Sequence, residues 1–305
     1  MAEKVDVSED GLTYTATLRD GLKWSDGSDL TAEDFVYTWK RMVDPATASE
    51  YAYLATESHL KNAADINAGK NTDLNSLGVK AEGNKVIFTL TEPAPQFKSL
   101  LSFSNFVPQK ESFVKAAGKD YGTSSEKQLY SGPYTVKDWN GTSGTFKLVK
   151  NKNYWDAKNV KTQTVKVQTV KKPDTAVQMY KQGKLDFANI SGTSAIYNAN
   201  KKNKDVIPVL EATTAYMVYN QTGSVEALSN LKIRQALNLA TDRKGIVSAA
   251  VDTGSKAATG IAPTGLAKLA DGTDLAEHVA PGYKYDDKAA GKLLSLIHIS
   301  EPTRP

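Results

Sequence analysis

The chain has 305 residues, which is enough for about two domains with buried cores. Hydrophobic residues make up 40% and charged residues 24%, a composition that excludes a disordered or membrane-embedded chain. The net charge is +4, and the lysines are scattered along the sequence rather than gathered into an arginine-rich patch, so no nucleic-acid partner is expected. The absence of cysteine excludes disulfides, thiol nucleophiles and thiolate metal ligands within this stretch.

The first predicted element is a half-buried strand at residues 12–18, LTYTATL, where apolar residues alternate with threonine. Two Asp-Gly pairs, at 20–21 and 26–27, mark turns on either side of Trp24. Because the connections are short, we expect this tryptophan to fold back onto the apolar face of the neighbouring strand and helix.

A helix is predicted to follow, in LTAEDFVYTWKRMVDP. Thr31 is the expected N-cap, Glu33 and Asp34 place acidic charge in the first turn, and Pro45 helps to end the helix. The expected buried face consists of Phe35, Val36, Trp39 and Met42.

Further along the chain, short strands come in pairs. LGVKAEG (77–83) and KVIFTL (85–90) flank a turn at Asn84, and SGPYTVKDW (131–139) and GTFKLVKNKNYW (144–155) predict a hairpin around Asn140-Gly141. TVKVQTV (164–170) is expected to be another short strand.

The stretch from 173 to 190 predicts a helix followed by a strand. Asp174 is the expected N-cap, Gly183 the C-terminal stop, and LDFANI (185–190) the strand, an alternation typical of an α/β layer. Another helix is predicted near 230–247, with Ile233, Ala236, Leu237 and Ala240 at helical spacing.

Several of these segments together resemble a known family. They are SEDGLTYTATLRDGLKWSDGSDLTAEDFVYTWKRMVDPATAS (8–49), SGPYTVKDW, NKNYWD, GKLDFA and IRQALNLATDRKGI. In this order they are similar to extracellular solute-binding protein family 5, the large oligopeptide-binding proteins of peptide ABC transporters. The resemblance covers essentially residues 1–294.

The resemblance implies an α/β fold of the type II periplasmic-binding-protein kind, with two lobes and an extra small domain, incomplete here. Residues 1–110 would be the small domain, 111–212 the body of lobe one, and 213–294 the truncated beginning of lobe two. Family members are considerably longer, so we expect an internal fragment. The last residues, SLIHISEPTRP (295–305), break the preceding amphipathic pattern, and we expect them to be a non-native tail.

In the resembled family an oligopeptide lies between two closing lobes and is held by main-chain hydrogen bonds, while its side chains enter hydrated pockets. Ile190 stands where some family members have asparagine, which implies altered pocket preference. The groups that grip the peptide termini are expected outside this chain. The positions that match ligand-contacting positions are Tyr51, Asn189, Ile190, Ser191, Gly192, Tyr216 and Asn220.

The residues themselves also allow simpler interpretations. Tyr51 could be a packing residue, residues 190–192 could be a turn that ends a strand, and Tyr216 lies in an alternating apolar run that would by default be core.

The resemblance implies permease subunits of an ABC transporter as partners, an extracytoplasmic location, and no cofactor. We expect a monomer, either in the periplasm or on the cell surface as a lipoprotein, and in the second case it would meet the membrane only through a lipid anchor outside this chain. The alternatives are the same fold with another solute, such as nickel or an oligosaccharide, and a surface adhesin or peptide-holding chaperone.

Nothing in the sequence favours an enzyme. The three histidines are His59, His278 and His298, none at metal-ligand spacing, and HExxH, GxSxG and GxxxxGK[ST] motifs are missing. We expect His59 to be a solvated loop or helix residue. The acidic pairs at 33–34 and 286–287 are better explained as helix-start charges than as the two carboxylates of a glycosidase.

Overall fold

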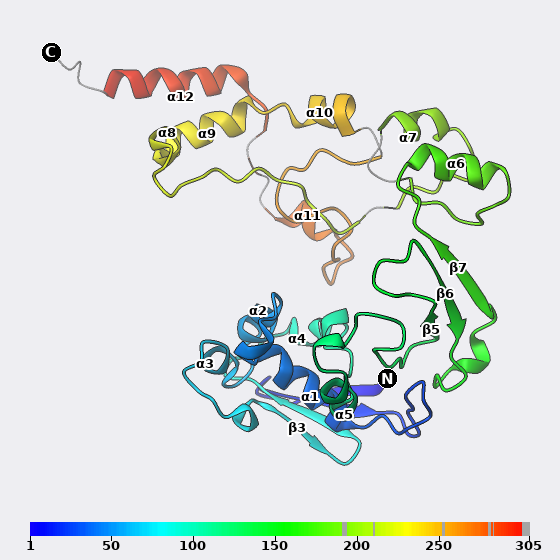
Figure 1. The fold of residues 1–305 in the computed structure, drawn as a ribbon. Coiled ribbons are helices and arrows are strands. Elements are labelled where there is room, and N and C mark those ends of the chain that lie inside the picture. The colour runs from blue at the N-terminus through cyan, green and yellow to red at the C-terminus, as the bar shows by residue number, and fades with distance from the viewer. Residues whose placement is uncertain (191–193, 210, 252–253, 280–281, 283, 301–305) are drawn as a thin grey trace. The chain divides into compact units, whose positions relative to one another are not determined.

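The computed structural model describes residues 1–190, 194–209, 211–251, 254–279, 282 and 284–300, with the backbone alone at 250, 251 and 296–300. The chain forms two compact units, Met1–Thr169 and Val170–Pro305. Figure 1 shows the elements of each unit. The predicted domain boundaries at residues 110 and 212 stay predictions.

The first unit begins with a four-stranded antiparallel sheet in the order β1-β2-β4-β3. The predicted strand at 12–18 is confirmed as β2, and its Tyr14, Ala16 and Leu18 side chains are buried. The predicted pair around Asn84 is confirmed as the β3–β4 hairpin. The strands are β1 Ala2–Val7, β2 Thr13–Leu18, β3 Val79–Glu82 and β4 Lys85–Thr89.

Helix α1 (Ala32–Val43) packs on this sheet, against β3 and β4. Thr31 is its N-cap, as predicted, and forms a capping box with Asp34. Lys40 and Arg41 lie in the last turn, where cations complement the helix dipole. The remaining helices of this part are η1 Pro45–Thr47, α2 Ala52–Glu57, α3 Ala63–Asn67, η2 Leu74–Ser76, α4 Phe97–Leu100, η3 Ser104–Phe106, α5 Glu111–Ala117 and η4 Gly118–Asp120.

The core of the first unit contains a group of aromatic rings around Trp39, which is 1% exposed. Its ring stacks on Phe106 at a centroid distance of 3.9 Å and meets Phe88 edge-on at 5.2 Å. Phe97 lies 5.8 Å from the same ring. The sheet, α1 and the short helices thus enclose one core, and we call residues 1–120 the N-terminal layer.

A second sheet follows, with three antiparallel strands in the order β5-β6-β7. The predicted hairpin around Asn140-Gly141 is confirmed, and Gly141 has φ +89°, which favours glycine at this turn. The elements are β5 Tyr134–Lys137, β6 Thr145–Lys150, η5 Ala157–Asn159 and β7 Thr164–Gln168. We call residues 121–169 the three-stranded region.

In the second unit the described residues form helices joined by irregular segments (Figure 1). The predicted helix near 230 is confirmed as α9, which packs against α12, with Ala236 and Ala290 buried. It ends at Ala240 rather than near 247, and the separate helix α10 follows, capped by Asp242. α12 continues through Ser300, beyond the point where its amphipathic pattern changes. The helices are α6 Pro173–Lys181, α7 Ser194–Asn200, α8 Glu226–Ser229, α9 Leu231–Ala240, α10 Arg243–Ile246, the π-helix η6 Val247–Val251, α11 Leu275–His278 and α12 Asp287–Ser300.

Two predictions around α6 are wrong. The N-cap is Lys172 rather than Asp174, because Pro173 occupies the first helical position, where its fixed φ and missing N–H are tolerated. Residues 185–190 are irregular instead of a strand, and Phe187 is 81% exposed. A strand exists only with a hydrogen-bonded neighbour, and none of the described strands pairs with this segment.

Candidate functional site

The turn at 20–27 is the most distinctive motif of the sequence, and the structure shows what it holds. Trp24 is 2% exposed, as the packing interpretation predicts, and its backbone N–H donates to the Ser28 carbonyl at 2.8 Å. Its indole Nε1 donates to Asp34 Oδ2 at 3.2 Å. Gly27 has φ +88°, which closes the turn.

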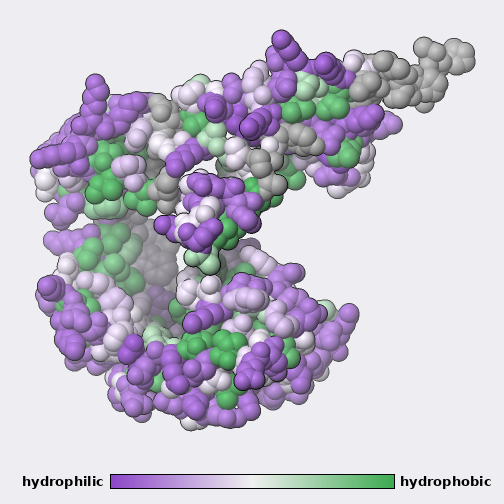
Figure 2. Space-filling view, turned by 180° about the vertical axis from the view of Figure 1, so that it is seen from behind, coloured by the Kyte–Doolittle hydropathy of each residue, from purple (hydrophilic) through white to green (hydrophobic). Residues whose placement is uncertain are grey.

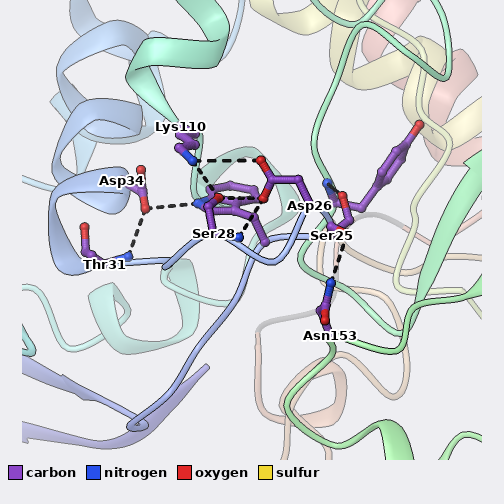
Figure 3. A network of polar contacts seen from close by, with 9 residues as sticks. Ser25, Asp26, Ser28, Thr31, Asp34, Lys110 and Asn153 are labelled. Carbon is purple, nitrogen blue, oxygen red and sulfur yellow. Dashed lines mark hydrogen bonds and ion pairs between the residues drawn. The ribbon is translucent and has the colours of Figure 1, made fainter.

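The next residue, Ser25, joins the N-terminal layer to the three-stranded region (Figure 3). Its N–H donates to the Tyr130 carbonyl at 2.7 Å, and its Oγ accepts from the Tyr130 N–H at 3.1 Å. The Asn153 side-chain amide donates to the Ser25 carbonyl at 3.0 Å. We call this set of contacts the Ser25 joint.

Other contacts strengthen the attachment of the turn. The Arg19 guanidinium lies 4.3 Å from the centre of the Trp155 ring, a cation–π contact between the two parts. Lys110 Nζ donates to Ser28 Oγ at 2.5 Å and lies 3.9 Å from Asp26 (Figure 3). Burial opposes the ionisation of Asp26, but hydrogen bonds from Ser28 together with the Lys110 charge lower its pKa below the usual value.

Asp34 is a buried carboxyl group at the start of α1, 8% exposed. Its Oδ2 accepts both from the Trp24 indole and from the Thr31 backbone N–H, the latter at 2.9 Å. Burial raises the pKa of Asp34, and the hydrogen bonds and the Lys110 charge offset this only in part. Both hydrogen bonds hold the start of α1, so the structure gives Asp34 a local structural role in the capping box.

Tyr51, the predicted ligand contact in the first unit, is the N-cap residue of α2 and is 42% exposed. Its ring lies 6.3 Å from that of Tyr53 and 6.2 Å from that of Phe103, which are 53% and 44% exposed. Tyr51 is thus a part-exposed ring that also packs on two neighbours, and its role in ligand contact stays a prediction. We call Tyr51, Tyr53 and Phe103 the aromatic cluster.

A shallow pocket of about 180 Å³ includes residues adjacent in sequence to the aromatic cluster. Arg41 lies in its wall and donates from Nη1 to Gln109 Oε1 at 3.0 Å. A second pocket, of about 250 Å³, includes His59 and Asp65. Both are below the ~300 Å³ at which ligand cavities usually begin, so neither encloses a peptide by itself.

The predicted contacts in the second unit lie in two irregular segments. Asn189 is exposed and Ile190 half-buried after α6, whereas Ser191 and Gly192 lie outside the described residues. Tyr216 is 74% exposed, so its interpretation as a core residue is wrong.

Asn220 forms a local turn, because its Oδ1 accepts from the Thr222 N–H at 2.9 Å and its Nδ2 donates to Ser224 Oγ at 2.9 Å. The structure thus gives each predicted contact in the described residues an accessible side chain.

Sequence reasoning missed the aromatic cluster beyond Tyr51 and the partners of Ser25. The repeated tyrosine in YAYL was a signal for Tyr53, but nothing local pointed to Phe103, which lies some fifty residues away. Nothing in the turn at 20–27 indicates the contacts of Ser25, because its partners Tyr130 and Asn153 are distant in sequence.

The described residues contain no group of three or more histidine, aspartate or glutamate side chains that could hold a metal ion. His59 has φ +59° in an exposed connection, with Nδ1 4.0 Å from Glu92 Oε2, in agreement with its predicted solvated position. None of the helices in the described part of the chain is long and apolar enough to cross a bilayer.

Comparison with known families identifies the chain. The sequence pattern of the bacterial extracellular solute-binding proteins, family 5 (middle region), matches residues 1–299. The chain belongs to this family. The W-S-D-G turn and its joint are thus features of a family-5 chain.

Individual relatives agree with this assignment. The family-5 chain is 46% identical over 304 residues to the dipeptide-binding protein of Lactococcus lactis subsp. cremoris (strain MG1363), covering 96% of this chain and 54% of the relative. It is 33% identical over 249 residues to the oligopeptide-binding protein OppA of Bacillus subtilis (strain 168), covering 81% of this chain and 45% of that protein. The chain thus spans about half the length of the curated relatives it matches.

The fold is shared as well. The structure of Listeria monocytogenes OppA bound to peptide superposes with a TM-score of 0.82 at 34% identity, over 99% of this chain and 59% of that one. The predicted type II binding-protein fold is confirmed for the part that the family-5 chain covers. The mixed helices and sheets of the first unit fit that class.

Proposed function

We propose that the protein to which this chain belongs is the substrate-binding component of an ABC importer, which captures oligopeptides and delivers them to membrane permease subunits. One observation carries the proposal: 46% identity over 96% of the chain to a protein named for dipeptide binding. The shared fold with a peptide-bound OppA supports it.

The proposed capture is binding without chemistry. A peptide bridges two lobes and shifts the population towards a closed state, and main-chain hydrogen bonds supply affinity that is independent of sequence. We assign ligand contact to Tyr51, Asn189, Ile190, Ser191, Gly192, Tyr216 and Asn220.

The aromatic cluster supports the role proposed for Tyr51. The Tyr51 ring lies 6.3 Å from that of Tyr53 and 6.2 Å from that of Phe103, and all three rings are part-exposed, so they offer an aromatic surface of the kind that lines ligand sites. In Figure 2, green hydrophobic areas interrupt the mostly hydrophilic surface of the face shown. The cluster would receive an apolar side chain of the peptide.

The same proposal includes where the protein works and with which partners. It works outside the cytoplasmic membrane, in agreement with the extracellular family description, as a monomer without a cofactor. Its proposed partner in the membrane is the permease. Its family consists of binding proteins, and catalysis is no part of the proposed function.

Native mass spectrometry of the full-length protein, purified from its source without refolding, tests the proposal. We expect a ladder of small heterogeneous adducts that are released on denaturation and fragment as peptides. A single non-peptide adduct, such as nickel or an oligosaccharide, would mean that the protein is a solute-binding protein for that ligand instead of for peptides. Turnover of added peptides that disappears with one carboxylate substitution would contradict a binding protein.

The same measurement tests the assigned site. In the full-length protein we expect Tyr51→Ala to reduce peptide occupancy at equal protein concentration, because a ring that contacts the ligand is lost. Tyr285→Ala is the matched control, since Tyr285 is comparably exposed, at 51%, outside the proposed site. Equal occupancy in the two variants would remove Tyr51 from the site.

A further inference from the structure

One face of the β5-β6-β7 sheet carries a row of lysines. Lys137 of β5 lies directly opposite Lys147 of β6, and Lys147 lies directly opposite Lys166 of β7. Residues paired across antiparallel strands point to the same face, so the three side chains cross the whole sheet side by side. All three are exposed. We call them the lysine row.

The rest of this face is polar. Because side chains alternate between faces along a strand, the lysine row shares its face with threonines, a glutamine and one valine. The opposite face holds Val136, Phe146, Leu148, Val165 and Val167, together with Tyr134 and Lys150 at one end. The sheet is thus amphipathic, and three of the four lysines in its strands lie on the polar side.

Positive charge is concentrated in this part of the molecule. Residues 131–169 contain seven lysines and two aspartates as their charged residues, a net charge of +5, whereas the whole chain has +4. Outside residues 131–169 acidic residues therefore balance the lysines and arginines, whereas within this stretch the lysines outnumber the acidic residues. The seven are Lys137, Lys147, Lys150, Lys152, Lys158, Lys161 and Lys166.

The row is only partly neutralised within the chain. Lys147 Nζ pairs with Asp138 at 2.7 Å. The hydrogen bonds that Glu126 accepts lower its pKa, and the charge of Lys137 also contributes to this lowering. Like charges directly opposite each other on a sheet destabilise it, so the row costs stability. An external polyanion on this face would offset that cost.

We propose that the lysine row and its surroundings form a docking surface for anionic phospholipid headgroups, so that the protein lies with this sheet face against a membrane. The composition argues against other partners. Lysine is depleted in protein interfaces, which favour aromatic residues and arginine, and neither type occurs on this face. A face with no aromatic ring also lacks the platform on which single-stranded nucleic-acid bases stack.

This inference goes beyond solute capture, and its test needs no peptide. The 305-residue chain is sedimented with vesicles of phosphatidylcholine, alone or with about 30 mol% phosphatidylglycerol, at about 0.05 M and 0.5 M NaCl. We expect binding only to the anionic vesicles and only at low salt. Lys137→Gln, Lys147→Gln and Lys166→Gln together should weaken the partition coefficient on the order of a hundredfold, at about fivefold for each lysine.

A matched triple variant, Lys61→Gln, Lys70→Gln and Lys98→Gln, removes the same charge from exposed positions of the N-terminal layer. It should weaken binding less than tenfold by the loss of long-range attraction alone, about a tenth of the expected effect at the row. Replacing the row by arginine should preserve binding, since charge carries it. Circular dichroism checks that each variant folds.

Three outcomes would overturn the proposal. They are equal loss in the two triple variants, equal binding to zwitterionic vesicles, and binding to soluble polyphosphate without binding to anionic vesicles. Equal loss in the two triple variants would mean that the net charge of the chain drives binding. Equal binding to zwitterionic vesicles would mean that apolar surface drives it. Binding to polyphosphate alone would mean that the partner is a soluble polyanion. None of them bears on whether the full-length protein captures peptides.

Discussion

Residues 13–18 and 213–218 have similar compositions, with tyrosine and threonine among small and apolar residues, but the structure treats them differently. The first segment is β2, paired on both sides, with Tyr14 3% exposed and its hydroxyl donating to the Ala94 carbonyl at 2.9 Å. The second is irregular, with Tyr216 74% exposed. An alternating pattern therefore prepares a segment for a sheet, and neighbouring strands decide whether it joins one.

The largest effect is expected from making the same substitution in both segments. Tyr14→Ala should lower the free energy of unfolding by about 3 kcal/mol, because it removes a buried ring and its hydrogen bond. Tyr216→Ala should change it by less than about 0.5 kcal/mol, as for other exposed positions.

Urea unfolding measures both variants. Fluorescence of the four tryptophans, all in the first unit, reports that unit, and circular dichroism also reports the helices of the second. A large loss of stability for Tyr216→Ala would show that this ring is buried in solution and would remove the contrast between the two segments.

A medium effect is expected at the Ser25 joint, which ties the well-packed layer to the three-stranded region. Ser25→Ala leaves the Tyr130 N–H without its acceptor, and such a loss costs about 1 kcal/mol. We expect faster hydrogen exchange of the Tyr130 amide and of the region around Asn153. Ser102→Ala, which removes only a local hydrogen bond within the layer, is the control and should leave these amides unchanged.

The smallest effect is expected from Asp34→Asn, and it depends on pH. Because burial raises the pKa of Asp34 in the folded state, its contribution to stability is fully present below the ordinary value of 3.8 and is lost as the pH rises through the folded pKa. An asparagine carbonyl can accept both hydrogen bonds of Oδ2 without ionising. The variant should therefore gain stability relative to the natural chain as the pH rises above about 4.

Asp26→Asn is the companion measurement, with the opposite sign. The pKa of Asp26 is lowered in the folded state, so its contribution is present above the ordinary pKa and is lost as the pH falls through the folded value. Urea unfolding at a series of pH values should show the two variants diverging in opposite directions. Parallel profiles would mean that the two carboxyl groups have the same environment.

Much of the first unit could be predicted because its signals are local. The alternation in β2, the Thr31 cap of α1 and the Asn140-Gly141 turn each depend on residues a few positions apart. At 173–190 the same reasoning was wrong about the helix cap, where Pro173 overrode Asp174, and about the strand, which has no neighbour among the described residues.

For the candidate site, the sequence indicated single residues, and the structure showed which residues contact them. Tyr51 was found through the family resemblance, whereas its contact with Phe103 depends on how α2 and the segment before η3 pack. The Ser25 hydrogen bond to Tyr130 joins positions 105 residues apart, and no local pattern encodes such a pair.

The sequence by itself determined the family, helix α1 and most strands of the first unit, and the exclusion of thiol chemistry, because composition, periodicity and motif spacing are properties of neighbouring residues. Only the tertiary structure decided which strands find partners, which tyrosines are exposed, and that three lysines from separate strands stand side by side. These features depend on register and long-range contact, where a shift of one residue would move every side chain to the other face.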